Sequence, residues 1–269
     1  MIELPEAETI EKQANELLKA KTVKKTIEGN SPHKFCFFNG DFSDYNKNLR
    51  GKTFTKAQGH GMYADLLFED LMITVNDGVN CRLTSELFKK YQYAIEFSDG
   101  TYLVFTVAMY GGICVSKDGW DNFYYLNSKK SVSPLLDGFD FNYFENLFKN
   151  CKKDYSLKAF LATEQRIPGL GNGCLQDILF NAKIHPKRKM KSLKSGEFEN
   201  LFFSVKKTLS EMTEKGGRDT EKDLTGNYGG YRTILSKNTI LLPCSVCGER
   251  IIKEAYLGGA VYYCPCCQK

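Results

Sequence analysis

Four cysteines near the end of the chain have the spacing of metal ligands. Cys244 and Cys247 form one C-x2-C pair, Cys264 and Cys267 form another, and 16 residues lie between the pairs. Each two-residue gap turns two thiolates toward one ion, and the intervening segment is long enough for a hairpin that returns the second pair. The spacing therefore predicts a zinc ribbon with one structural Zn²⁺. Cys266, inside the second pair, is a competing ligand.

A glycine-rich turn in the middle of the chain precedes a segment that favours a helix. In the sequence IPGLGN, Pro168 and Gly169 end one helix, and Asn172 is in position to cap the next. The first backbone N–H groups of a helix attract anions, and glycines before them leave room for a phosphate. Gly171 and Asn172 are therefore predicted to bind phosphate.

Positive charge gathers just beyond this helix. Lys187, Arg188 and Lys189 follow one another directly, and such a run can track the phosphates of a nucleic acid. A capped helix pair that merely packs, followed by a solvated basic loop, accounts for the same residues about as well. Both interpretations stay open at this point.

Composition limits the class of protein that positions these groups. The chain has 269 residues, of which 42% are hydrophobic and 26% are charged, a balance typical of a folded protein with one or two cores. No apolar run is long enough to cross a membrane, and the acidic N-terminus is unlike a signal peptide. We therefore expect an intracellular protein. The net charge of +5 alone does not separate a nucleic-acid binder from a mildly basic enzyme.

The first half of the chain has the pattern of a helix followed by a sheet. Residues 5–28 begin with acids and end with lysines, which predicts an amphipathic helix. From 33 to 127, short aromatic and β-branched runs such as NFYYL alternate with turn residues and predict an antiparallel β-sandwich. Its hairpin turns are expected at Asn39-Gly40, Asp77-Gly78 and Asp99-Gly100.

The second half has a helical period. Apolar residues recur three or four apart in four segments, 139–150, 156–166, 172–184 and 195–217, and each predicts a helix. Residues 216–238 are polar and rich in glycine, which predicts a mobile connector. We therefore expect an α+β protein with three regions, at 1–130, 131–225 and 236–269.

Three motifs, taken in order, resemble those of one family. ELPEAETI, at 3–10, is similar to the N-terminal signature of the formamidopyrimidine-DNA glycosylase and endonuclease VIII (Fpg/Nei) family. IPGLGN resembles that family's helix-two-turn-helix, and the four-cysteine ribbon completes the order. The resemblance implies an N-terminal antiparallel β-sandwich with a leading helix, a helical helix-two-turn-helix domain that binds DNA, and a C-terminal zinc-ribbon hairpin. It also implies a DNA cleft between the domains.

The resemblance further implies catalytic residues at the start of the chain. In the family, an N-terminal proline amine attacks the anomeric carbon of the sugar, expels the damaged base and forms a Schiff base that leads to strand cleavage. Glu3, which moves protons in this scheme, and Glu6 are both present. Ile2 stands at the proline position, and its nitrogen can attack only if removal of Met1 leaves a free amine.

At other positions too, neutral or small residues replace the family's catalytic and DNA-binding residues. Met62 stands where the family has a lysine, and Gly259 stands where it has a phosphate-binding arginine. Val79 falls near the residue that normally fills the gap left by a flipped base, and Met109 and Gly111 stand where the family has an arginine and an aromatic wedge. Loss of these groups predicts a flatter salt dependence of DNA binding and weaker extrusion of a base.

The resemblance leads to one expected function and two alternatives. We expect a monomeric, DNA-associated protein that recognises damaged duplex DNA in base-excision repair. It resembles a DNA glycosylase that removes oxidised or modified bases, with impaired amine-based lyase chemistry and with Glu3 activating water in place of the amine. The first alternative is a DNA-binding member of the family without catalytic activity. The second is a protein-interaction scaffold whose zinc ribbon is purely structural.

Overall fold

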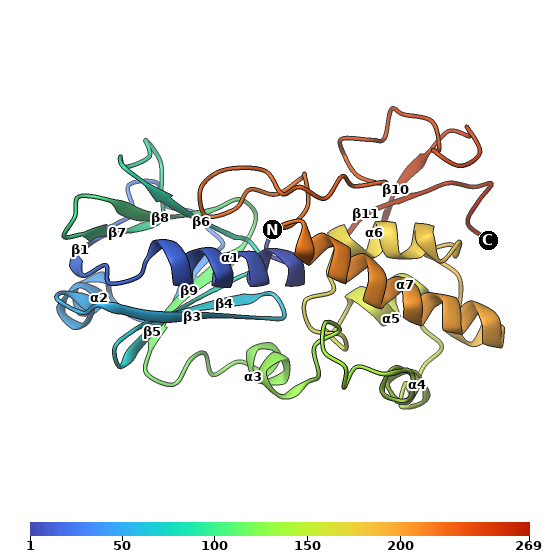
Figure 1. The fold of residues 1–269 in the computed structure, drawn as a ribbon, viewed down its shortest axis with the longest axis horizontal. Coiled ribbons are helices and arrows are strands. Elements are labelled where there is room, and N and C mark those ends of the chain that lie inside the picture. The colour runs from blue at the N-terminus through green and yellow to red at the C-terminus, as the bar shows by residue number, and fades with distance from the viewer.

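The computed structural model describes all 269 residues and consists of a sandwich, a helical domain and a C-terminal hairpin (Figure 1). The sandwich side of the chain contains α1 Leu4–Leu17, β1 Val23–Glu28, β2 Cys36–Phe38, α2 Phe42–Leu49, β3 Phe54–His60, β4 Tyr63–Phe68, β5 Leu71–Asn76, β6 Val79–Thr84, β7 Tyr93–Phe97, β8 Tyr102–Val107, β9 Gly111–Ser116 and α3 Phe123–Lys130. The remainder contains α4 Phe141–Lys149, α5 Leu157–Ala162, α6 Asn172–Asn181, the short 3-10 helix η1 Met190–Ser192, α7 Ser195–Glu214, β10 Ile252–Tyr256 and β11 Gly259–Tyr263.

Two sheets form the sandwich, and they confirm the predicted architecture. One has the strand order β1-β7-β8-β6 and the other the order β2-β9-β5-β4-β3. Neighbouring strands are antiparallel, except that β2 pairs with β9 in parallel. Side chains such as Ile73 from one sheet and Phe105 from the other share one core. The alternation of apolar residues along the strands builds this core from both inner faces.

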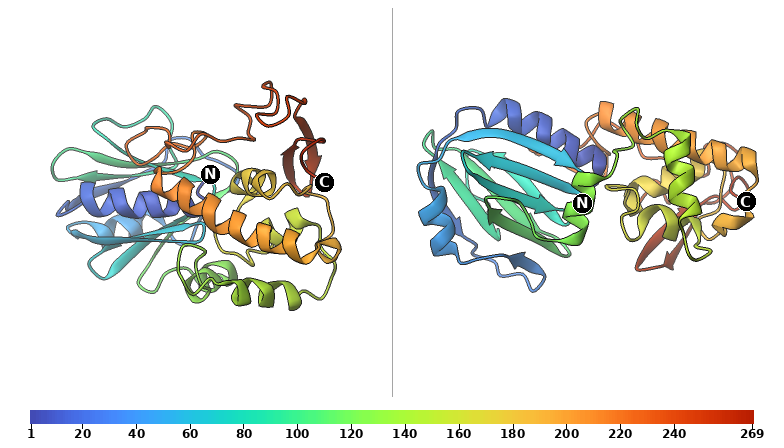
Figure 2. Two further views of the ribbon diagram at one scale, coloured as in Figure 1. Left: turned by 45° about the vertical axis from the view of Figure 1, so that its right-hand side comes forward. Right: turned by 90° about the horizontal axis from the view of Figure 1, so that it is seen from below.

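Helix α1 connects the sandwich with the helical domain. At Gly59 of β3, an added Cβ would lie 2.6 Å from the carbonyl of Ala7, so a glycine is needed for this close approach. Ile2 and Ala7 belong to the sandwich core, whereas Leu4 belongs to the core of the helical domain. The start of the chain is therefore fixed where the two domains meet (Figure 2).

The four helices predicted in the second half are confirmed as α4, α5, α6 and α7. Local caps set two of their starts: Asp140 accepts a hydrogen bond from the N–H of Tyr143, and Ser156 accepts one from the N–H of Ala159. No helix combines the length and hydrophobicity that a bilayer span requires. The boundaries of the three regions stay predictions.

The helix predicted for 5–28 is wrong beyond Leu17. The chain turns at Ala20, whose φ of 61° is left-handed, and residues from Val23 onward form β1. The β-branched residues in this stretch pair with β7, for example Thr26 with Ile95. Lysines that indicated the end of a helix are instead on an edge strand, where charge protects an open edge.

Two of the three expected hairpins are wrong, and one is confirmed. Asp99-Gly100 connects β7 and β8, with Gly100 at a φ of 84°. Asn39-Gly40 instead leads from β2 into α2. Asp77-Gly78 joins β5 and β6, which belong to different sheets. NFYYL, expected as a strand, starts α3, because Asn122 caps the backbone N–H groups of Tyr124 and Tyr125.

Residues 216–238, which we call the strap, are packed against both domains. The expectation of a free connector is wrong, since Arg218 and Leu224 are fully buried. Leu224 belongs to the sandwich core, and its carbonyl accepts a hydrogen bond of 2.8 Å from the N–H of Leu83 in β6. In Figure 1 the strap leaves α7, crosses over the sandwich and returns to the hairpin.

Candidate functional site at the domain junction

The carboxylate of Glu3 occupies the N-terminus of helix α6. Its Oε2 accepts hydrogen bonds from the N–H of Gly171 at 3.1 Å and of Cys174 at 2.8 Å, and its Oε1 accepts one from Gly173 at 2.7 Å. Glu3 is 1% exposed. The expectation that these N–H groups are bare and await a phosphate is wrong, because a carboxylate from the start of the chain already satisfies them.

The buried guanidinium of Arg218, in the strap, binds two carboxylates of the N-terminal segment where the two domains meet. Arg218 donates to Glu3 at 3.1 Å, and it donates to both oxygens of Glu6, at 3.0 Å from Nε and 2.7 Å from Nη2. Burial alone opposes ionisation of Glu3, but Arg218 and the helix N–H groups outweigh it and lower the pKa of Glu3. Glu3 is therefore held as a carboxylate, and neither of its oxygens is free.

The nitrogen of Ile2 is also engaged. It is a peptide nitrogen in this structure, and its N–H donates to the carbonyl of Asp77 at 2.6 Å. The Ile2 side chain is buried in the sandwich core. The N-terminal ammonium of Met1 forms an ion pair with Glu221 of the strap, and the Met1 carbonyl accepts from Arg218 at 3.3 Å. The start of the chain is thus fixed along its backbone as well as by its side chains.

The carboxyl group of Asp77 has fewer hydrogen-bond donors than that of Glu3. Its Oδ2 accepts a hydrogen bond of 3.0 Å from the hydroxyl of Tyr110, whereas no donor reaches the buried Oδ1. Burial raises the pKa of Asp77 to about 6, and the charge of Glu3 adds to this rise. Sequence reasoning missed Asp77, since its one signal was an Asp-Gly pair that also indicates a turn.

Asn172 contacts the hairpin instead of capping its own helix. Gly171 is the N-cap residue of α6, and the side-chain amide of Asn172 donates to the carbonyl of Ala260 in β11 at 2.9 Å. The predicted capping role is therefore wrong. The Oδ1 of Asn172 is buried and has no partner. One acceptor thus stays available beside the start of α6.

A buried lysine lies next to the hairpin glycine. Lys158 of α5 is 2% exposed, and its Nζ donates to the carbonyl of Tyr256 at 2.5 Å. A Cβ added at Gly259 would lie 3.5 Å from both this Nζ and the amide nitrogen of Asn172. Sequence reasoning missed Lys158, although a single cation inside an apolar helical segment was a usable signal.

The predicted basic run holds parts of the protein together. Lys187 pairs with Glu254 of β10 at 2.7 Å. Arg188 donates to both oxygens of Glu197, each at 2.6 Å. Lys189 donates to the carbonyl of Asp154 at 3.0 Å. Each cation therefore has an intramolecular partner, and this geometry favours the packing interpretation of the run.

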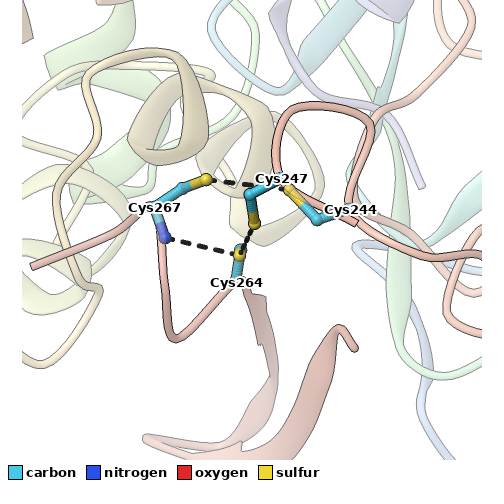
Figure 3. Close-up of side chains that lie close together, drawn as sticks. All are labelled: Cys244, Cys247, Cys264 and Cys267. Carbon is cyan, nitrogen blue, oxygen red and sulfur yellow. Dashed lines mark hydrogen bonds between the residues drawn. The ribbon is translucent and has the colours of Figure 1, made fainter. Parts of the chain in front are cut away.

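The four predicted metal ligands lie together at the base of the hairpin (Figure 3). The sulfur atoms of Cys244, Cys247, Cys264 and Cys267 are all within 4.8 Å of one another. The shortest separations include 3.8 Å between Cys244 and Cys267, and 3.5 Å between Cys247 and Cys264. Zn–S bonds of about 2.3 Å in a tetrahedron place sulfurs about 3.8 Å apart. The four thiolates therefore fit Zn²⁺, whereas Cys266 is exposed outside the cluster.

The positions aligned with the family's gap-filling residue, arginine and aromatic wedge differ in exposure. Val79 is 1% exposed and lies in the sandwich core, and Gly111 is buried in β9. Met109 and its neighbour Tyr110, by contrast, are exposed by 58% and 48%. Of the three aligned positions, Met109 alone presents its side chain to solvent, together with its neighbour Tyr110.

Known proteins resemble this chain in its helical domain and along its whole length. Residues 131–223 match the formamidopyrimidine-DNA glycosylase H2TH domain. The formamidopyrimidine-DNA glycosylase of Shouchella clausii is 27% identical over 277 residues, which cover 100% of this chain and 99% of that protein. The domain match and the similarity along the whole chain support membership of the Fpg/Nei family. A second relative, the glycosylase of Prochlorococcus marinus strain NATL2A, is 35% identical over 142 residues, about half of either protein.

Solved Fpg structures share the whole fold. The MutM (Fpg) protein of Thermus thermophilus superposes with a TM-score of 0.81 at 21% identity, covering 99% of this chain and 98% of that one. The Fpg of Lactococcus lactis, solved with DNA that contains an abasic site, gives a TM-score of 0.83 at 23% identity and covers 99% of both chains. The Fpg/Nei arrangement of sandwich, helical domain and cysteine hairpin is therefore confirmed for this chain.

Proposed function

We propose that this Fpg/Nei protein recognises damaged duplex DNA and hydrolyses the bond between a modified base and its sugar, with water in place of an amine nucleophile. The relatives that match along the whole chain are named as DNA glycosylases. The observation that carries the proposal is the nitrogen of Ile2, which is a buried peptide donor bonded to Asp77. While Met1 is attached, the Ile2 nitrogen is a peptide nitrogen without a lone pair available for attack, so water is the nucleophile that we propose.

Groups suited to DNA surround the domain junction. Lys158 places a positive charge beside Gly259, where the family arginine is missing. Such a cation can take over part of the phosphate contact. Met109 and Tyr110 present exposed apolar and aromatic surface, on which a base can stack. These features support a DNA partner for the junction.

Base release and strand cleavage can be separated in one experiment. Duplexes with a single oxidised purine, oxidised pyrimidine or abasic site are incubated with the protein, then run with and without hot alkali. We expect breaks at a lesion only after alkali, because hydrolysis leaves an intact abasic strand. Borohydride should trap no covalent adduct, since no Schiff base forms.

Each other result contradicts a different part of the proposal. A borohydride adduct that mass spectrometry locates at the N-terminus would show that an amine attacks. Tight binding without base release would favour the inactive DNA-binding alternative. Absence of binding even at low salt would leave the scaffold alternative.

Lys158→Met is expected to weaken DNA binding and to lower the slope of log K against log salt by about 0.9, which corresponds to one released counterion. Methionine keeps most of the side-chain volume, so the apolar contacts of α5 should persist. Fluorescence anisotropy across a salt series measures the slope. Lys47→Met on α2, an exposed lysine on the sandwich, is the matched control and should leave the slope unchanged. Equal slopes for both variants would exclude a phosphate contact by Lys158.

A further inference from the structure

The domain junction contains two carboxyl groups whose environments differ sharply. Glu3 has three backbone donors and one guanidinium on its two oxygens. Asp77 has a single hydroxyl donor and one oxygen without a partner. The pKa of Glu3 is lowered, whereas burial raises that of Asp77 to about 6. When two neighbouring acids have different pKa values, the acid with the raised pKa is the one suited to proton transfer near neutral pH.

We propose that Asp77, and not Glu3, is the general base that activates the hydrolytic water. The inference rests on the proposed function, because it assigns a residue to the hydrolysis described above. An oxygen that carries no hydrogen bond can accept one from water, and Asp77 Oδ1 is such an oxygen. Every oxygen of Glu3 would first have to lose a backbone or guanidinium donor.

Tyr110 contacts both the Asp77 carboxyl group and the turn that follows it. The carbonyl of Tyr110 packs so closely on the turn after Asp77 that a Cβ at Gly78 would lie 1.5 Å from it. The Tyr110 side chain is 48% exposed, and its hydroxyl reaches inward to Asp77. Displacement of this one side chain by a nucleotide would open the route for a water molecule to Oδ1. Tyr110 is thus a positioning residue for Asp77.

The groups that face Asp77 come from every element around it. Glu3 raises the pKa of Asp77, while the Tyr110 hydrogen bond, the N-terminal ammonium and Arg218 lower it. Tyr63 of β4 is also close: burial raises the pKa of Tyr63, and the charge of Asp77 adds to this rise. Burial outweighs the lowering contributions. The Asp77 carboxyl group therefore changes charge in a pH range where an enzyme can use both its protonated and its ionised form.

The proposed step balances without a further reactant. The oxygen of one water molecule bonds to C1′ of the damaged nucleotide while Asp77 takes the proton from that water. The bond between C1′ and the base nitrogen breaks, and its electron pair leaves with the base. The base takes up a proton from solvent, and Asp77 then releases its proton to solvent. The products are the free base and an abasic sugar with a hydroxyl group on C1′.

Asp77→Asn tests the assignment in the full-length protein. We expect base release to fall by about 10²- to 10⁴-fold, the range for loss of a general base, with unchanged DNA affinity by anisotropy. In the wild type, kcat/KM should fall on the acid side of about pH 6, where Asp77 becomes protonated. This acid limb should be absent from the residual activity of Asp77→Asn.

Tyr110→Phe provides a readout that a purely structural role would not give. The Tyr110 hydroxyl lowers the pKa of Asp77, so its removal should raise that pKa and move the acid limb of kcat/KM to higher pH. Phe123→Leu, at an exposed aromatic residue of α3, is the matched control and should leave the limb in place.

Thermal unfolding shows whether Asp77→Asn keeps the fold. The raised folded-state pKa of Asp77 means that its own contribution to stability is fully present below about pH 4 and is lost as pH rises through about 6. The variant lacks this loss, so its Tm should exceed that of the wild type above pH 6, with the gap closing below about pH 4.

The outcomes separate this inference from the function on which it rests. Wild-type base release with an equally active Asp77→Asn overturns the role of Asp77 alone. An acid limb that does not move in Tyr110→Phe overturns it as well. Absence of base release from every lesion by the wild type overturns both. Loss of activity in Asp77→Asn together with a shifted limb in Tyr110→Phe supports the assignment.

Discussion

Arg218→Met is expected to destabilise the protein by about 3–5 kcal/mol, the usual cost of leaving buried charges without their partner. Arg218 is 2% exposed and is the common cation of Glu3 and Glu6, which are themselves buried. Without it, two carboxylates would face each other in the core of the domain junction. Urea unfolding followed by circular dichroism gives the change in free energy. Arg50→Met, at an exposed arginine, is the control and should shift the midpoint little.

The cause of this loss can be tested separately from its size. If uncompensated charge is the reason, Glu3→Gln and Glu6→Gln added to Arg218→Met should recover much of the stability, because the amides are neutral. A loss below about 1 kcal/mol for Arg218→Met would contradict the role of the buried ion pairs. A triple variant no more stable than the single one would point to lost packing instead.

Cys264→Ser is expected to abolish metal binding and to unfold the hairpin formed by β10 and β11. Cys264 is fully buried and is one of the four cysteines of the cluster. Structural zinc sites contribute about 10–16 kcal/mol of binding free energy in small domains, and the hairpin has few buried side chains of its own to replace it. Metal content by atomic absorption and protection of hairpin amides by hydrogen exchange measure the two effects.

Cys266→Ser is the matched control for the metal site. It removes a thiol from the same turn, but one that is exposed and outside the cluster. It should retain one Zn²⁺ per chain and an ordered hairpin. Full zinc content in Cys264→Ser, or loss of zinc in Cys266→Ser, would refute the ligand set of Cys244, Cys247, Cys264 and Cys267.

The parts of the fold that depend on local pattern could be predicted from the sequence. Four helices follow from their apolar period, and the sandwich follows from short alternating runs with turns. The zinc cluster was predictable because each ligand pair is set by a turn of four residues. The start of β1 was not, since the lysines around Val23 suit a helix end and an edge strand equally.

The centre of the candidate site could not be predicted, because its contacts join distant parts of the chain. Glu3 meets the N–H of Gly173 across 170 residues and Arg218 across 215. Nothing local in the sequence around Arg218 indicates that its guanidinium is buried. Asp77 was hidden for a related reason: its turn connects two sheets, and its buried carboxyl group lies near Glu3, Tyr110 and Arg218, which are distant in sequence.

The strap also affects how the protein can fold during synthesis. The sandwich core contains Leu224, although every strand of the sandwich ends before residue 117. N-terminal domains usually fold first, as soon as they leave the ribosome. Here the sandwich would emerge with a gap in its core, and Glu3 and Glu6 would lack their guanidinium partner. Both remain so until the strap has been synthesised and packs against the sandwich. We therefore expect the ribosome to release nearly the whole chain before the first domain reaches its final packing.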